Sequence, residues 1–212
     1  MKELIYDILI QNTRILTPDM TIRSGVDVAI KDGMISSICS SGSLSCQEAE
    51  QTVDGSRLLW MPGLTDGHMH TCQQLLRGKI LDALPMIWTR IMLPFESTLT
   101  PEAVSLSAAL CSLEMIRGGT TSFLDAGGIH MDEAAKIYIK SGLRGALTLS
   151  TMDDTKVPDS MRADAAESIS RLNEYYNTWN GSGDGRLSVY YSLRSLISCS
   201  EELIRGVFEA AS

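Results

Sequence analysis

Residues 61–70 of the chain read Met61-Pro62-Gly63-Leu64-Thr65-Asp66-Gly67-His68-Met69-His70. In an extended strand alternate side chains share a face, so Asp66, His68 and His70 point one way and Met69 the other. The two imidazoles then lie about 6.5–7 Å apart at Cα, close enough to bind one ion at Zn–N distances of ~2.0–2.1 Å. An acidic neighbour on that face can orient a ring. The pattern predicts a transition-metal site with His68 and His70 as ligands; the alternative is two ordinary polar residues at a strand end.

Downstream of this stretch, strand-like and helix-like segments alternate. Thr100-Pro101 is typical of a helix start and Gly118-Gly119 of a helix end. The predicted elements are helix 101–117, strand 120–124, helix 132–141, strand 143–149, helix 159–179, strand 187–193 and a helix capped by Ser200. With residues 61–70 as the first strand, four strands are each followed by a helix, which predicts a parallel βα array.

Four βα units make half of an eight-fold barrel. We therefore expect an α/β fold in which residues 61–212 form the first half of a (β/α)8 TIM-like barrel, strands 1–4 with their helices. The last helix still runs at Ala211, which we interpret as a truncation. A complete open sheet of four strands is the alternative. In a barrel, His68 and His70 would lie at the C-terminal end of the first strand, where barrel active sites are built.

Residues 1–60 have a different pattern, with short β-branched runs separated by polar turns. Asp32-Gly33 lies between two apolar runs, which is the strongest short-range signal for a hairpin. Residues 40–45 form a Ser/Gly loop. This part of the chain is predicted to be a small antiparallel β module.

Composition narrows the classes of partner. The 212 residues carry 18 Lys+Arg against 26 Asp+Glu, a formal charge of −8, and no basic run, so nucleic acid and anionic membranes are not expected partners. No apolar stretch is long enough to span a bilayer, and charges at Lys2, Glu3 and Asp7 argue against a signal peptide, so we expect a cytoplasmic protein. Five cysteines without a C-x-x-C pair argue against a disulfide framework or a cysteine zinc site.

The string from Pro62 to His70 resembles the P-G-x-x-D-x-H-x-H signature of the amidohydrolase superfamily. The similarity continues through Leu75-Leu76-Arg77-Gly78, residues 113–121, Asp125 and Ser198-Cys199-Ser200, which are similar to the branch of guanine deaminase, S-adenosylhomocysteine deaminase and the s-triazine chlorohydrolases. The resemblance implies a (β/α)8 barrel joined to a β-sandwich built from both chain ends, with residues 1–60 as its N-terminal part.

The same resemblance implies that His68 and His70 bind one divalent metal ion, with Zn²⁺ expected and Fe²⁺ as the alternative. The family's further histidine ligands, its acid/base Glu in an H-x-x-E segment and its Asp from the eighth strand have no counterpart in this sequence, so a catalytic Glu is expected beyond Ser212. His130 is the remaining histidine. We interpret it as a loop residue, with pocket lining as the alternative. The strand at residues 187–193 contains no Lys, which favours one metal over a Lys-bridged pair.

Three residues are candidates for reading a substrate. Gln73 matches a glutamine that touches the purine edge in guanine-deaminase-like sequences, and its amide offers both a donor and an acceptor. Arg194 begins a run, residues 194–200, that resembles the guanine deaminase stretch in which an arginine holds the base carbonyl. A planar guanidinium offers fixed donors for such an oxygen. Trp88 could form an aromatic wall over a flat ring. The structural alternatives are a solvent-facing Gln73, a salt-bridged Arg194 and a core position for Trp88.

Two hypotheses follow. The first is a metal-dependent hydrolase that deaminates or dechlorinates an N-heterocyclic small molecule, such as a purine, a nucleoside derivative or a triazine, through a metal-activated water. Resembling enzymes also suggest a homo-oligomer. The second is a non-catalytic half-barrel, a fragment or assembly partner that needs its missing half, because an open parallel sheet exposes its edges.

Overall fold

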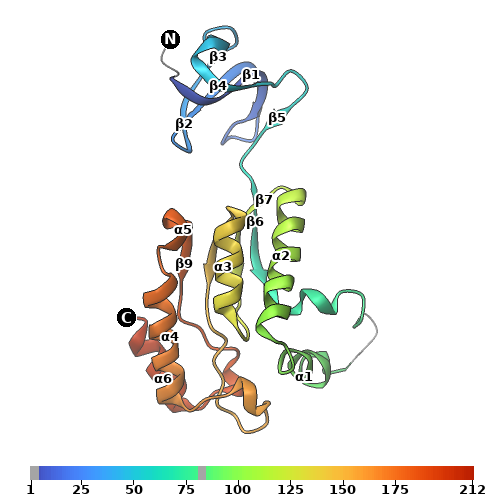
Figure 1. The fold of residues 1–212 in the computed structure, drawn as a ribbon, viewed down its shortest axis with the longest axis vertical. Coiled ribbons are helices and arrows are strands. Elements are labelled where there is room, and N and C mark those ends of the chain that lie inside the picture. The colour runs from blue at the N-terminus through green and yellow to red at the C-terminus, as the bar shows by residue number, and fades with distance from the viewer. Residues whose placement is uncertain (1–4, 81–84) are drawn as a thin grey trace. The chain divides into compact units, whose positions relative to one another are not determined.

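The computed structural model describes residues 5–80 and 85–212. The chain separates into two compact units, with the boundary between Pro62 and Gly63. Each unit has its own sheet (Figure 1).

The first unit is a five-stranded mixed sheet. Its strands are β1 (Tyr6–Leu16), β2 (Ile22–Lys31), β3 (Met34–Ser40), β4 (Ala49–Asp54) and β5 (Leu59–Trp60), in the order β3-β2-β1-β4 with β5 beside β1. The β2–β3 hairpin turns at Asp32-Gly33, whose φ angles of 52° and 72° are both positive, as a type I′ turn requires. The predicted hairpin is confirmed. The prediction of an all-antiparallel module is wrong, because β4 and β5 run parallel to β1.

The second unit is built on a four-stranded parallel sheet in the order β6-β7-β8-β9. The strands are β6 (Leu64–Met69), β7 (Thr120–Asp125), β8 (Arg144–Leu147) and β9 (Leu187–Val189). The long helices that follow them are α2 (Pro101–Gly118), α3 (Met131–Ser141), α4 (Ala165–Trp179) and α6 (Glu201–Ala210) (Figure 1). The predicted succession of four parallel strands, each followed by a helix, is present.

Short helical segments complete this unit. They are 3₁₀ turns at Thr71–Leu76, Asp159–Met161 and Leu196–Ser198, a π-helical turn at Trp88–Met92, and the short helices α1 (Leu93–Glu96) and α5 (Ser182–Gly185); a further 3₁₀ turn, Cys46–Glu48, belongs to the first unit. The sequence pattern predicts no helix or strand between residues 71 and 99, so the segments of this stretch that the structure describes are additions to the predicted fold.

Local chemistry explains where the long helices begin and end. The Thr100 side chain accepts a hydrogen bond from the Ala103 N–H at the start of α2, and Gly119 ends that helix in the left-handed region at φ 80°. Ser200 caps α6 in the same way. The predicted helix 159–179 starts later, at Ala165, because the Asp164 carboxylate caps the Glu167 N–H. The predicted strand 187–193 ends at Val189, so Arg194 lies beyond the strand.

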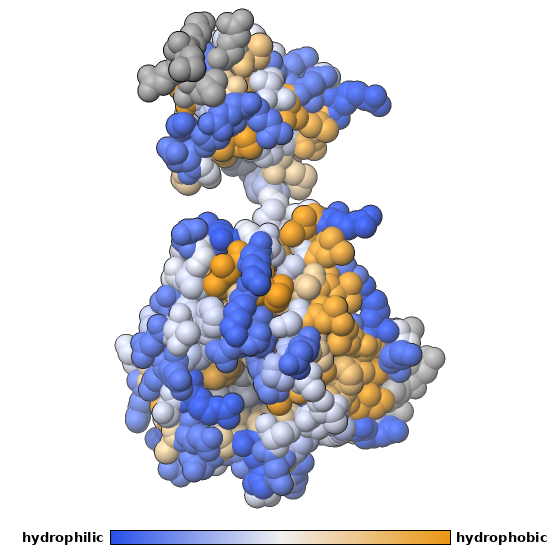
Figure 2. Space-filling view, in the orientation of Figure 1, coloured by the Kyte–Doolittle hydropathy of each residue, from blue (hydrophilic) through white to orange (hydrophobic). Residues whose placement is uncertain are grey.

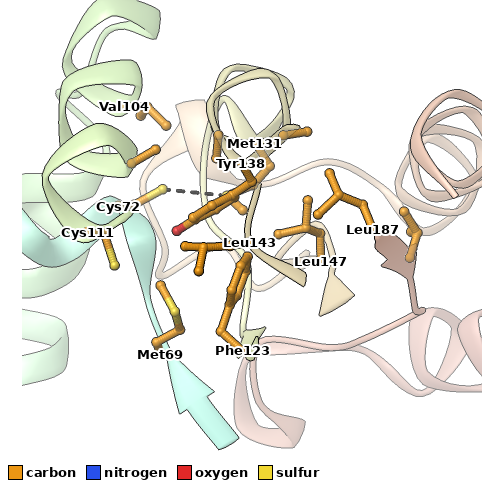
Figure 3. Close-up of a cluster of buried hydrophobic side chains, with 14 of the residues drawn as sticks. Met69, Cys72, Val104, Cys111, Phe123, Met131, Tyr138, Leu143, Leu147 and Leu187 are labelled. Carbon is orange, nitrogen blue, oxygen red and sulfur yellow. Dashed lines mark hydrogen bonds between the residues drawn. The ribbon is translucent and has the colours of Figure 1, made fainter. Parts of the chain in front are cut away.

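The core of the second unit fills the space between the sheet and its helices (Figure 3). Met69 from β6 and Phe123 from β7 point into it, and Tyr138 on α3 is fully buried there. Its aromatic rings pack tightly, with Phe123 and Tyr138 centroids 4.3 Å apart. This packing holds the strand ends at which the candidate site lies.

Helix α2 is also apolar on its outer side. Leu106, Leu113 and Ile116 are 61%, 53% and 52% exposed, and apolar side chains gather along this helix in Figure 2. Among the described residues no single helix is long and apolar enough to cross a membrane; one bent pair, Trp88–Glu96 with Pro101–Gly118, passes that test by length and composition alone, at an angle of 111°.

Candidate metal centre

His68 in β6 and His70 directly after it lie side by side at the C-terminal end of this strand. Their ring centroids lie 5.0 Å apart, with the ring planes at 83°. Met69 between them is 6% exposed and packs into the core, so the predicted alternation of faces holds for His68, Met69 and His70. It does not extend regularly to Asp66, because the register of β6 with β7 shifts between Asp66 and Met69. Asp66 was expected to orient a ring; instead its carboxylate accepts a hydrogen bond from the main-chain N–H of His68, at 3.1 Å.

One imidazole nitrogen of His70 is available as a metal ligand. Its Nδ1 is buried and has no hydrogen-bond partner among the described residues. Burial lowers the pKa of His70, and the positive charge of Arg194 lowers it further, while Glu96 and the main chain of Gly127 act in the opposite direction. A neutral imidazole with an unused nitrogen is the form that binds Zn²⁺ and similar ions, so this position fits a metal ligand.

A cavity of about 380 Å³ opens beside the two rings. Its lining brings together all five residues singled out from the sequence, which come from the end of β6 and from three later segments of the chain. The lining residues are His68, His70, Gln73, Trp88, Met92, Ala126, Tyr190, Ser192, Leu193 and Arg194. The placement at the carboxyl ends of parallel strands is the usual position of sites in such sheets.

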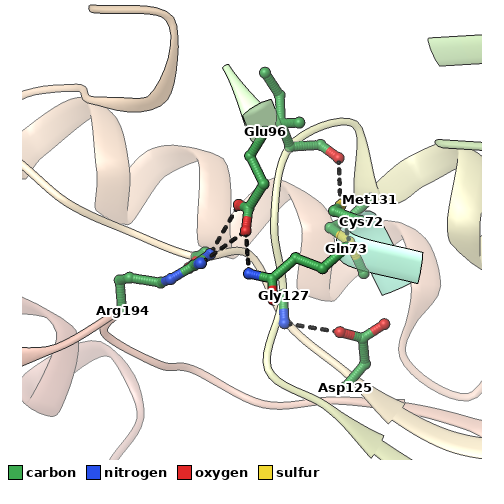
Figure 4. Close-up of polar contacts among 9 residues, drawn as sticks. Cys72, Gln73, Glu96, Asp125, Gly127, Met131 and Arg194 are labelled. Carbon is green, nitrogen blue, oxygen red and sulfur yellow. Dashed lines mark hydrogen bonds and ion pairs between the residues drawn. The ribbon is translucent and has the colours of Figure 1, made fainter. Parts of the chain in front are cut away.

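Glu96, at the end of α1, organises the polar side of this cavity (Figure 4). Its side chain is 0% exposed and forms a two-point ion pair with Arg194, at 2.8 and 3.0 Å. It also accepts a hydrogen bond from the Gln73 amide. Arg194 is therefore salt-bridged, and Gln73 is held by a carboxylate instead of facing water.

Sequence reasoning missed Glu96. The residue lies in an apolar stretch, Ile91-Met92-Leu93-Pro94-Phe95, with no local motif around it. The only available signal was this isolation, since a lone carboxylate in an apolar run needs a buried partner. Tyr190 was also missed as a lining residue; its hydroxyl donates to the Asp125 main-chain carbonyl at 2.6 Å.

His130 does not join the pair at β6. It precedes α3 at a φ of 54°, and its Nε2 lies 3.1 Å from the Leu99 carbonyl oxygen. It lines a separate cavity of about 320 Å³ between α3 and α4. In residues 5–80 and 85–212, no group of three or more His, Cys, Asp or Glu side chains is arranged to hold a metal ion, so the described chain offers two ligands.

The chain resembles known sequences over most of its length. The profile of the Amidohydrolase family matches residues 59–212. The chain is 32% identical to a 5'-deoxyadenosine deaminase of Methanosarcina barkeri, over 97% of this chain and 46% of that protein. It is 33% identical to a 5-methylthioadenosine/S-adenosylhomocysteine deaminase of Acetivibrio thermocellus, over 97% and 47%. The chain thus spans about half the length of these relatives.

Solved structures share the fold. A guanine deaminase from C. acetobutylicum, with guanine in its active site, superimposes with a TM-score of 0.81 at 21% identity, over 95% of this chain and 49% of that one. An atrazine chlorohydrolase from Arthrobacter aurescens, complexed with zinc, gives 0.80 at 18% identity, over 96% and 50%. Together with the family match over most of the chain, this shows that the protein belongs to the amidohydrolase family.

Proposed function

We propose that this chain supplies the metal-binding half of an aminohydrolase that acts on an N-heterocyclic substrate, with an adenosine derivative as the first candidate. The observation that carries the proposal is the pair of imidazoles 5.0 Å apart at the end of the first parallel strand, one with a bare buried nitrogen, beside a cavity of about 380 Å³. The deaminase relatives at 32–33% identity support the substrate class.

His68 and His70 are the residues that would hold a divalent ion, with zinc first and iron second. When bound, such an ion supplies Lewis-acid chemistry that activates water for attack on an amino- or chloro-bearing ring carbon. Burial keeps His70 neutral, so its ring is ready to ligate without first losing a proton. In this proposal the four strands correspond to strands 1–4 of a barrel, and the first unit to part of a β-sandwich.

The other cavity residues have roles in orienting the substrate. The half-buried Trp88 ring offers a flat apolar surface for a heterocycle. Gln73 donates to Glu96 through its amide nitrogen, which leaves the amide oxygen to accept from an exocyclic amino group. Arg194 uses three of its five N–H groups on Glu96 and Ser150, which leaves two donors for a ring carbonyl or a side group.

Metal titration of the 212-residue chain tests the centre directly. Co²⁺ is added to the metal-free chain and followed by its visible absorption. We expect one ion per chain, with binding lost in His68→Ala and in His70→Ala and kept in the control His130→Ala. Equal Co²⁺ binding in the wild type and in the His68→Ala and His70→Ala variants would overturn the assignment.

A second candidate function is that of an assembly partner without activity of its own. It is favoured by the ligand count, since the described residues offer two metal ligands where a catalytic zinc site typically uses three protein ligands and a water. Ammonia release from 5'-deoxyadenosine, methylthioadenosine and guanine, measured with the Zn²⁺-loaded chain, separates the two. Turnover supports the hydrolase; bound metal without turnover supports the partner.

A further inference from the structure

Thr71 follows the candidate ligand His70 directly and is held from three sides. Its hydroxyl donates to the Asp125 carboxylate at the end of β7 and lies 2.5 Å from the Tyr138 hydroxyl on α3. Its carbonyl accepts a hydrogen bond from the Ser107 hydroxyl on α2, at 2.6 Å. All three polar contacts are within the core, so the main chain next to His70 cannot shift without breaking them.

Asp125 also holds the loop at Gly127, which lies next to the His70 ring. Its second oxygen accepts the Gly127 N–H at 3.0 Å (Figure 4). Gly127 is in the left-handed region at φ 79°, where a Cβ would lie 2.8 Å from the Thr148 carbonyl oxygen, so the loop is closely packed at this point. The main chain of Gly127 lies close enough to the His70 ring to raise its pKa. The carboxylate thus fixes both the backbone after His70 and the loop against its ring.

The strand register ties the same residues together. Met69 pairs with Asp125 across β6 and β7, and the Ala126 N–H donates to the Met69 carbonyl at 2.8 Å. His70 is therefore bracketed on both sides, by Met69 and by Thr71, and each neighbour is joined to the end of β7.

Asp125 itself cannot reach a substrate. It is 0% exposed, and the residue from the end of β7 that lines the cavity is Ala126. Both carboxylate oxygens already accept hydrogen bonds. Asp125 therefore does not contact a molecule bound in the cavity, and its effect on the site is exerted through His70.

We propose that Asp125 is a positioning residue, which, through Thr71 and Gly127, fixes the direction in which the His70 ring presents its free nitrogen to a divalent cation. Groups that orient a metal-ligating histidine typically change metal affinity 10- to 100-fold when they are removed. This inference rests on the proposed metal centre, in which His70 is a ligand.

The test uses the full chain and four variants. Asp125→Ala removes both hydrogen bonds, whereas Asp125→Asn keeps an oxygen acceptor for Gly127 and an amide partner for Thr71. Thr71→Val removes one hydroxyl at nearly constant volume. The matched control is Asp27→Ala, because Asp27 in the first unit is also 0% exposed and also accepts two main-chain N–H groups, from Asn12 and Gly42 at 2.8 Å each.

Two readouts separate positioning from general loss of structure. We expect the Co²⁺ dissociation constant to rise about 10- to 100-fold in Asp125→Ala and about 10-fold in Thr71→Val. It should stay within about threefold of the wild-type value in Asp125→Asn and be unchanged in Asp27→Ala. In the metal-free chain, the ¹⁵N signals of the His70 ring should move in Asp125→Ala and Thr71→Val and stay in place in the other two.

The outcomes are distinguishable. A folded Asp125→Ala or Thr71→Val variant with wild-type Co²⁺ affinity and unmoved His70 signals overturns the positioning role. If the wild type binds no Co²⁺ through His68 and His70, the proposed metal centre fails, and the metal-free His70 signals alone then decide whether Asp125 sets the ring. If Asp125→Ala does not fold, Thr71→Val carries the decision.

Discussion

Glu96 and Arg194 lie 98 residues apart in the sequence and form a two-point ion pair whose side chains are 0% and 4% exposed. The pair joins the short helix before α2 to the segment after β9. Arg194 of this pair lines the cavity beside His68 and His70.

Removing the negative charge of this pair should destabilise the second unit. Glu96→Gln leaves the buried Arg194 guanidinium without a counter-ion, and we expect the free energy of unfolding to fall by about 3 kcal/mol. Urea denaturation measures this. The control is Glu201→Gln, which removes the charge from the exposed pair of Glu201 with Arg205, 78% and 73% exposed, and should change stability by less than about 0.5 kcal/mol. Equal effects of both variants would contradict the prediction.

The stability of the wild type relative to Asp125→Asn should depend on pH. Burial raises the pKa of Asp125 from its ordinary 3.8 to about 6. Between these values the native state binds the proton more tightly than the unfolded state, so the wild type loses stability as pH rises through this window. Relative to the neutral Asn variant, the loss should approach about 3 kcal/mol by pH 7. Denaturation of both chains at pH 4 and pH 7 checks this; the same stability difference at both pH values would count against it.

His70 should titrate below its ordinary pKa of 6.5, because burial and the charge of Arg194 both disfavour the imidazolium. Its contribution to stability is then complete above pH 6.5 and decreases as pH falls from there toward the lower native pKa. A ring NMR titration of the metal-free chain gives the midpoint directly. The His70→Gln variant should lack this part of the pH dependence, and a midpoint at or above 6.5 would refute the prediction.

Two glycines of the metal-site stretch should respond differently to a methyl group. A Cβ at Gly63 would overlap the Thr121 side chain, including its Cβ at 2.7 Å, which no rotamer change relieves. We expect Gly63→Ala to cost about 1–3 kcal/mol of unfolding free energy. Gly67 has no atom within 4 Å of an added Cβ, so Gly67→Ala should stay within about 0.5 kcal/mol. Thermal unfolding of the two variants compares them, and similar losses would show that the overlap is relieved.

The parts of the fold that could be predicted are those with local chemical signals. Thr100, Gly119 and the Asp32-Gly33 turn act within a few residues of themselves, and the structure has a cap or a turn at each. His68 and His70 could be identified because the period of an extended chain alone puts both rings on one face. Strand ends were less well predicted, because pairing across the sheet decides them, and β9 ends at Val189.

The missed features depend on contacts that are distant in sequence. Glu96 has a defined place only because Arg194 and Gln73 reach it. Asp159 begins only the short 3₁₀ turn Asp159–Met161, and α4 begins after Asp164. Between them Arg162 is extended and the Ala163 N–H donates to the Met152 carbonyl, a contact that is distant in sequence. The residues next to Glu96 do not indicate its ion pair, and those next to Asp164 do not indicate that α4 begins there.

The outward leucines and isoleucine of α2 also bear on how such experiments are run. An uncovered aliphatic band of this kind binds environment-sensitive dyes and draws molecules together as their concentration rises. Spectroscopic titrations of the chain therefore belong in dilute solution, with light scattering recorded alongside, so that a change in particle size is not mistaken for occupancy by an ion.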